Sequence, residues 1–224
     1  MDLQAIATSI RLAAWTTGCL LVLGMPIAYW LSFTRWRLRP IVEAVVALPL
    51  VLPPTVLGFY LLVALGPESP LGATWASLTG HLLPFSFGGL VVASVIYSLP
   101  FAVQPFTEAF SSVDRRLIEA AWCLGASRFG TFYRVIVPLS VRGIITGMVL
   151  SFAHTLGEFG VVLMVGGNRP GETRTASIAI YDDVQAMDYA AAGRTAIFLL
   201  VTSVVVLAVA YGLRRGVWKP WAQR

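Results

Sequence analysis

Five long apolar segments constrain the fold of this chain more than any other feature of its sequence. A helix of about 20 apolar residues is long enough to cross the hydrocarbon core of a bilayer. Only 12% of the residues are charged, which is about half the share found in ordinary soluble domains. We therefore predict an all-α, polytopic membrane protein with about five transmembrane helices in a single domain over residues 1–224, and we exclude a large soluble catalytic domain. The five segments are residues 10–33, 41–65, 86–108, 138–165 and 195–213.

The cysteines and the charge balance exclude several other classes of protein. Cys19 lies within an apolar segment and Cys123 within a basic amphipathic one, so neither a disulfide framework nor a thiolate metal site is indicated. We interpret both as small apolar residues and expect no metal site and no cofactor. In a membrane protein, basic residues indicate orientation before they indicate an anionic partner. The net charge of +5 therefore gives no support to nucleic-acid binding.

The connections between the segments alternate in their content of basic residues. An excess of Lys and Arg marks cytoplasmic connections. Twelve of the sixteen Lys and Arg residues fall in the stretches that follow the first, third and fifth segments. We therefore expect the N-terminus outside, the C-terminus in the cytoplasm, and residues 66–85 and about 166–194 outside. The twelve are Arg35, Arg37, Arg39, Arg115, Arg116, Arg128, Arg134, Arg142, Arg214, Arg215, Lys219 and Arg224.

The second apolar segment contains three prolines that interrupt its helical pattern. Pro49, Pro53 and Pro54 must break or kink a helix, because proline donates no backbone hydrogen bond and clashes with the preceding turn. At membrane depth, non-helical backbone is tolerated where protein buries it or where it lines a watery cavity. These prolines and the neighbouring Thr55 are therefore candidates for the wall of a translocation path. A kinked helix that serves only packing is the alternative.

Two ionisable residues, His154 and Glu158, lie in the fourth segment. Residues four apart share one face of a helix, and ionisable groups at membrane depth are functional candidates. We expect Glu158 to hold a neighbouring helix or to line a gate. His154 is either a hydrogen-bonded packing residue or part of a path wall. Several uncharged hydroxyl groups, which can donate hydrogen bonds, also lie in the segments: Thr55, Ser94, Ser98 and Ser151.

The connection over about residues 111–136 contains an amphipathic pattern. Asp114 is a candidate N-cap and Gly125 can end a helix in the left-handed conformation. A helix of this kind can dock into a groove on another protein, and Arg115, Arg116 and Glu119 can set its register there. The residues at the spacing of one helical face are Leu117, Ala120, Ala121 and Leu124.

This connection resembles the cytoplasmic motif of permeases of ABC importers. The resemblance rests on Glu119-Ala120-Ala121, then Gly125, then Val135-x-Val137-Pro138, where the family more often has Ile and Leu in place of the two valines. It implies a type I ABC importer permease fold in which this connection is a coupling helix that docks on a separate ATP-binding subunit. The coupling residues implied are Asp114, Arg115, Arg116, Glu119, Ala120, Ala121, Gly125 and Pro138.

The chain is not expected to be an enzyme. The nearest approach to a phosphate-binding loop, residues 166–173, has Glu172 where the motif requires lysine. An intramembrane enzyme is the least supported class, because neither Gly-x-Ser-x-Gly nor His-Glu-x-x-His occurs. A proton-coupled secondary transporter with His154 and Glu158 as a relay is a distant alternative, although no internal repeat of the kind found in many such transporters is visible.

The resemblance extends to the permease subunits of molybdate importers over residues 48–60, 156–160 and 170–181. Sulfate and tungstate importers are similar around the coupling motif and residues 157–160, so they remain alternatives. The resemblance implies an inner-membrane subunit that forms a homodimer in the lipid bilayer. It further implies two kinds of partner, an ATP-binding ABC subunit and a periplasmic or extracellular molybdate-binding protein.

Overall fold

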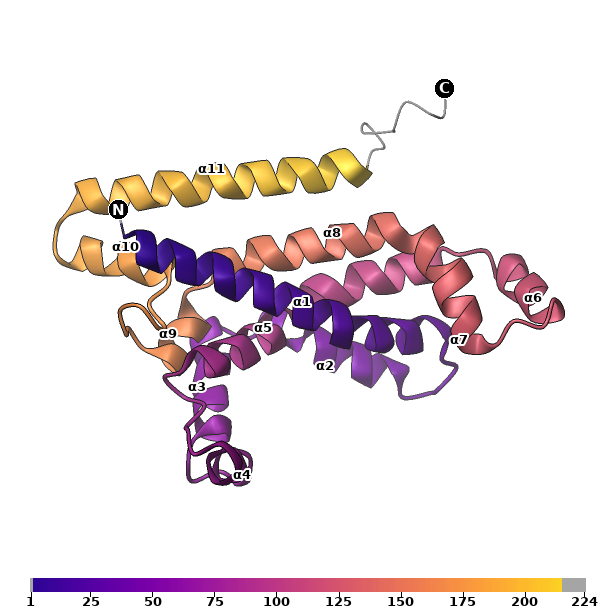
Figure 1. The fold of residues 1–224 in the computed structure, drawn as a ribbon, viewed down its shortest axis with the longest axis horizontal. Helices are drawn as coiled ribbons and strands as arrows, with labels where there is room; N and C mark the ends of the chain where they lie inside the picture. The colour runs from indigo at the N-terminus through magenta and orange to yellow at the C-terminus, as the bar shows by residue number, and fades with distance from the viewer. Residues whose placement is uncertain (1, 215–224) are drawn as a thin grey trace.

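The computed structural model describes residues 2–214, and every regular element in that range is helical. The basic residues Arg215, Lys219 and Arg224, expected on the cytoplasmic side, lie outside the described residues. The elements, labelled in Figure 1, are α1 (Leu3–Phe33), α2 (Arg39–Val51), α3 (Pro54–Leu65), α4 (Pro70–Thr79), α5 (Phe87–Ser111), α6 (Arg115–Cys123), α7 (Arg128–Thr131), the π-helical turn η1 (Phe132–Ile136), α8 (Val137–Leu156), α9 (Gly160–Gly166), α10 (Ala176–Gln185) and α11 (Tyr189–Arg214).

Four long helices form the body of the molecule. Helix α1 packs against α5 and α8, α5 packs against α8, and α11 lies along the outside of α8 (Figure 1). Within the described residues, four helical stretches are long and apolar enough to cross a membrane, and the bent pair α2–α3 makes a fifth if it counts as one span. The prediction of an all-α polytopic protein with about five spans is confirmed. The first and fifth helices begin earlier than predicted, at Leu3 and Tyr189.

The predicted break in the second segment lies at Leu52 and Pro53. Helices α2 and α3 meet there at an angle of 112°, and Leu52 is extended, with φ −70° and ψ 135°. Pro54 is the first residue of α3, where a missing N–H removes no helical hydrogen bond. Pro49 is buried inside α2. The proline pattern therefore predicted the break correctly.

The fourth segment is also broken, which the sequence did not predict. Helix α8 ends at Leu156, residues 157–159 are not helical, and α9 begins at Gly160. A Cβ atom at Gly160 would lie 2.8 Å from Cβ of Pro54, so α9 is seated closely against the start of α3. Because Glu158 lies beyond the end of α8, the expectation that His154 and Glu158 share one helical face was wrong.

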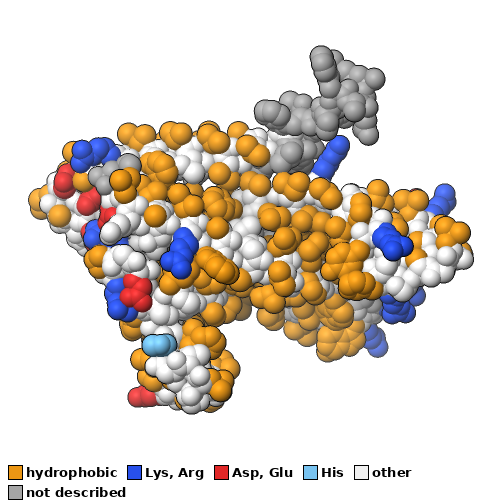
Figure 2. Space-filling model, in the orientation of Figure 1, with side chains coloured by type: hydrophobic (Ala, Val, Ile, Leu, Met, Phe, Trp, Pro, Cys, Tyr) orange, Lys and Arg blue, Asp and Glu red, His pale blue; other side chains and the backbone are white. Residues whose placement is uncertain are grey.

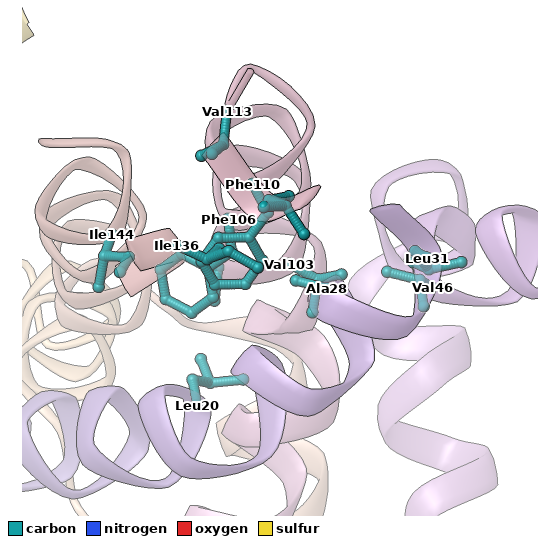
Figure 3. Close-up of a cluster of buried hydrophobic side chains, with 12 residues drawn as sticks. Leu20, Ala28, Leu31, Val46, Val103, Phe106, Phe110, Val113, Ile136 and Ile144 are labelled. Carbon is teal, nitrogen blue, oxygen red and sulfur yellow. The ribbon is translucent and has the colours of Figure 1, made fainter. Parts of the chain in front are cut away.

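The hydrophobic core fixes α5 between α1 and α8. Phe106 and Phe110 of α5 are fully buried and belong to one cluster with Leu20 of α1 and Ile144 of α8 (Figure 3). The contact between α5 and α8 is close, because a Cβ atom at Gly147 would lie 2.6 Å from the Phe106 ring. The facing sides of these two helices are thus held at a fixed distance.

The two ends of the bundle differ in their elements and charges. Helices α6 and α7 lie at one end with the connection between α1 and α2, whereas α9, α10 and the segment before α10 lie at the other (Figure 1). Hydrophobic side chains cover the long sides in Figure 2, and most charged side chains gather toward the ends. The end that carries α6 has the stretches with Arg35, Arg37 and Arg39 and with Arg115 and Arg116. This placement agrees with the expected alternation of basic connections.

Candidate functional site

The connection between α5 and α8 forms the predicted amphipathic helix, α6. Its first turn is capped by Asp114, whose carboxylate accepts a hydrogen bond from the backbone N–H of Arg116 at 2.9 Å. The helix ends at Cys123, and Gly125 follows with φ +84°, a conformation that costs glycine little and other residues more. The N-cap and the left-handed glycine were both predicted correctly.

Helix α6 presents its predicted face outward. Leu117 is 49% exposed and Leu124 is 89% exposed, whereas Ile118, which the sequence analysis did not single out, is 5% exposed and packs in the core cluster of α1, α5 and α8. Phe129 and Tyr133, from α7 and η1, add further exposed apolar area beside it. Contiguous exposed apolar surface rimmed by polar groups is typical of a protein interaction site.

The remaining predicted coupling residues occupy different surroundings. Arg115, Arg116, Glu119 and Ala120 are exposed on α6, and Ala121 is half-buried there. Pro138 lies on α8, just after η1, where the backbone N–H of Val137 donates to the carbonyl of Phe132. Proline clashes with the carbonyl four residues before it in an α-helix, and the wider π turn relieves that conflict. Pro138 therefore belongs to the start of α8 and not to α6.

A hollow of about 460 Å³ lies where α3, α5 and the break between α8 and α9 meet. We call it the α9-side hollow. It brings together four of the six predicted path residues. They are Pro54, Thr55, His154 and Glu158, and Tyr97 and Phe159 also line the hollow. Pro49 and Pro53 are not among the residues that line this hollow; Pro49 is buried inside α2 and Pro53 is the N-cap residue of α3.

The His154 ring in this hollow is held on several sides. Its Nδ1 lies 2.9 Å from the Ser98 hydroxyl, which in turn lies 2.9 Å from the Thr155 hydroxyl. The ring stacks on Phe101 with centroids 3.9 Å apart and lies 4.7 Å from the centroid of Tyr97. His154 is thus both a hydrogen-bonded packing residue and part of the hollow's wall.

Glu158 is 4% exposed and lines the same hollow. Neither of its carboxylate oxygens makes a hydrogen bond of good geometry, and the nearest candidate partner is the Ser94 hydroxyl, which is itself buried and makes no other hydrogen bond. Among the side chains that the structure describes, no Lys, Arg or His nitrogen lies within 4.0 Å of these oxygens. Its backbone is well anchored, because the carbonyl accepts a hydrogen bond from Ser177 and the N–H donates to Thr155. The carboxyl group is therefore a buried polar group whose hydrogen bonding is incomplete.

A second hollow, of about 560 Å³, lies between the halves of α5 and α8 that adjoin the α6 connection. We call it the α6-side hollow. Its polar lining includes Gln104 and Glu108 of α5 and Arg142 and Thr146 of α8. Phe101 lines this hollow and stacks on His154, which lines the other. The two rings therefore stand where the two hollows adjoin.

Most of these lining residues were not predicted from the sequence, although their spacing carries a signal. On α5, Tyr97, Phe101, Gln104 and Glu108 follow one another by four, three and four residues, which places them on one helical face. On α8, Arg142, Thr146, Leu150 and His154 recur at every fourth position. Two stripes of this kind, one on each of two apolar helices, are a sequence pattern from which facing linings could have been predicted.

The sequence matches the family described as binding-protein-dependent transport system inner membrane component over residues 21–219. The chain belongs to this family. The matched range includes α6 and both hollows. Transport proteins of this family reside in the inner membrane by the family's own description, which agrees with the apolar helices of this chain.

Two curated relatives of this permease align over nearly their whole length. The chain is 54% identical over 214 residues to the molybdenum transport system permease protein ModB of Azotobacter vinelandii, and this alignment covers 96% of the chain and 95% of that protein. It is 34% identical over 213 residues to ModB of Escherichia coli K12, with 95% and 93% covered. Both relatives are permease subunits by name, so the permease assignment holds over the full transmembrane body.

A solved ABC transporter has the same fold as this permease. A crystal structure of a bacterial ABC transporter for import of the acidic polysaccharide alginate superposes with a TM-score of 0.75 at 20% identity, covering 97% of this chain and 80% of the matched chain. The likeness confirms the predicted ABC importer permease fold. The match extends over nearly the whole described chain.

The end of the permease opposite α6 is tied together by ion pairs. Arg174 contacts Asp182 of α10 at 3.2 Å and Asp2 at the start of α1 at 3.5 Å, and Arg169 contacts Glu172 at 2.9 Å. Thr173 is fully buried, and its hydroxyl donates to the carbonyl of Gly166 at 2.7 Å. The segment before α10 is therefore fastened to α1, α9 and α10.

Proposed function

We propose that this permease is the transmembrane subunit of an ATP-driven importer for molybdate. The observation that carries the substrate assignment is the 54% identity, over nearly the full length of both chains, to a molybdenum transport permease. The sequence resemblance over residues 170–181 supports the same substrate class. The two hollows along α5 and α8 place polar side chains, among them Gln104, Thr146 and Thr55, within an otherwise apolar bundle.

The ATP-binding partner docks on α6 in this proposal. The exposed face that includes Leu117 and Leu124 would enter a groove of a separate ATPase subunit, with Arg115, Arg116 and Glu119 at its rim. ATP hydrolysis would then take place in that subunit and not in this chain. Ile118 fastens α6 to the core, so movement of the ATPase is transmitted to the membrane helices.

The rest of the assembly follows the expectations from the sequence. The N-terminus lies outside and the C-terminus in the cytoplasm, two copies of the chain form a homodimer, and an external molybdate-binding protein docks at the end that carries α9 and α10. The ion-paired segment around Arg174 offers a fixed surface for that docking. Closure of the ATPases would tilt α8 and open the hollows alternately toward the two sides.

The direct test is uptake of labelled molybdate in cells that lack this chain and in cells in which it is restored. We expect restoration of uptake that excess sulfate does not block. Tungstate as a second competitor separates the two metal oxyanions. Uptake that sulfate blocks fully, or no uptake after restoration, would contradict the molybdate assignment and would favour a sulfate importer.

A further inference from the structure

We propose that the α9-side hollow is a transit site in which a tetrahedral oxyanion is held by uncharged hydrogen-bond donors from Thr55, Tyr97, His154 and Glu158. This inference rests on the proposed function, because it assigns to named residues the passage of the substrate that the importer carries. It goes further by stating how the site binds a dianion without any fixed positive charge.

The side chains come from elements that meet only in the folded chain. Thr55 is at the start of α3, Tyr97 is on α5, His154 is in the last turn of α8, and Glu158 is in the break before α9. The hollow lies at the broken parts of two spans, where non-helical backbone at membrane depth is tolerated beside a watery cavity. An oxyanion there can keep some of its water while it exchanges the rest for hydroxyl and imidazole donors.

The hollow contains no Lys or Arg among its lining residues. A fixed cation would bind a dianion strongly, whereas a transport path needs binding that is favourable enough for entry and weak enough for release. Hydroxyl groups and a neutral imidazole meet that requirement. The Ser98 hydroxyl beside Nδ1 can donate to that nitrogen, which leaves Nε2–H of His154 as a donor.

The burial and the incomplete hydrogen bonding of the Glu158 carboxyl group point to a ligand in this hollow. The carboxyl is buried in the wall of the hollow, where Ser94 is its only hydrogen-bonding neighbour among the described side chains and neither oxygen makes a hydrogen bond of good geometry. An ionised carboxylate would repel a dianion, so the proposal requires the protonated acid, which donates one hydrogen bond and leaves the site without net charge. A buried carboxyl group whose hydrogen bonding the protein leaves incomplete can complete it when substrate passes.

The test uses the complete transporter in liposomes, formed by the permease, its ATP-binding subunit and the molybdate-loaded binding protein. Labelled molybdate uptake and ATP hydrolysis are measured together. Thr55→Val, His154→Phe and Glu158→Leu each remove a donor while keeping bulk. We expect each to lower uptake by about fivefold to tenfold, the effect of one lost hydrogen bond, while ATP hydrolysis stays within about twofold of wild type.

Conservative variants separate binding from folding. Thr55→Ser and Glu158→Gln keep a donor at the same place, and we expect them to recover most of the uptake that Thr55→Val and Glu158→Leu lose. The matched controls are Ser151→Ala and Thr202→Val. The Ser151 hydroxyl donates to the carbonyl of Gly147 and the Thr202 hydroxyl to that of Phe198, and neither residue lines the hollow. Both controls are expected to transport as wild type does.

Three results would overturn the inference. Wild-type uptake in Thr55→Val, His154→Phe and Glu158→Leu would show that the hollow does not hold substrate. A parallel loss of ATP hydrolysis and uptake would assign these residues to structure or coupling. An inactive Glu158→Gln would show that the carboxylate charge is required. A wild-type complex that carries labelled sulfate and not molybdate would instead overturn the proposed function, and the same variants would then test the hollow with sulfate.

Discussion

Leu124, at the end of α6, offers the sharpest test of the coupling surface. It is 89% exposed, so its replacement by alanine should leave the stability of the isolated chain within about 0.5 kcal/mol. Docking on an ATP-binding subunit would bury the side chain. Alanine lacks three of leucine's carbons, each worth about 0.8 kcal/mol when buried, so docking would lose about 2.4 kcal/mol.

This loss corresponds to about a 50-fold weaker association. The measurement is a titration of the purified permease with its ATP-binding subunit, which gives the dissociation constant directly. Leu78→Ala is the matched control, because Leu78 is 79% exposed on α4, at a distance in the chain from the α6 connection. An unchanged dissociation constant for Leu124→Ala would refute the docking surface. Equal weakening by Leu124→Ala and Leu78→Ala would refute its location.

Three further predictions follow from the same structure. Gly125→Asp should abolish uptake while the chain stays in the membrane, because φ +84° strains other residues and a charge would enter the docking contact; wild-type uptake would contradict the coupling mechanism. Gly147→Val should lower the free energy of unfolding by about 1–3 kcal/mol, which is typical of overpacking, because a Cβ atom at this position would lie 2.6 Å from the Phe106 ring. Gly18→Ala should leave it unchanged, because no heavy atom lies within 4 Å of a Cβ atom at Gly18. A reporter fused at Arg224 should be active only in the cytoplasm. Reporter activity outside the cytoplasm would contradict the proposed orientation of the chain in the membrane.

Local chemistry determined most of what could be predicted from the sequence. Asp114 caps α6 through a hydrogen bond to a residue two positions away, and Pro53 and Pro54 interrupt the second span through the geometry of their own rings. Such features depend on few neighbours. They were therefore visible without knowledge of the rest of the fold.

The break at residues 157–159 depends instead on distant packing. A Cβ atom at Gly58 would lie 2.7 Å from Cβ of Met164, and one at Gly160 would lie 2.8 Å from Cβ of Pro54, so α9 forms where α3 leaves room for it. Gly157, Glu158 and Gly160 interrupt the apolar run locally, but long apolar stretches on both sides favour one continuous helix when the contact with α3 is unknown. The error in placing His154 and Glu158 on one helix has the same origin.

Ile118 and the stripe on α5 illustrate two other limits. Leu117 and Ile118 are adjacent apolar residues, and only the contact with the core cluster decides that Ile118 is buried and Leu117 exposed. Tyr97 and Phe101 are common core residues in an apolar helix. Their role as walls of the hollows depends on α8 facing them, which is again a tertiary contact.

The connection from α6 to the hollows suggests how a push at one end reaches the other. Ile118 of α6 and Ile136 of η1 belong to the same core cluster, so α6 is packed against the base of α8. From Arg128 to Leu156 the chain is one helical stretch, interrupted only by the π turn. That stretch carries Arg142 in one hollow and His154 in the other. A tilt imposed on α6 would therefore move both linings together, and the ring pair of His154 and Phe101 is the point at which such a tilt would open one hollow to the other.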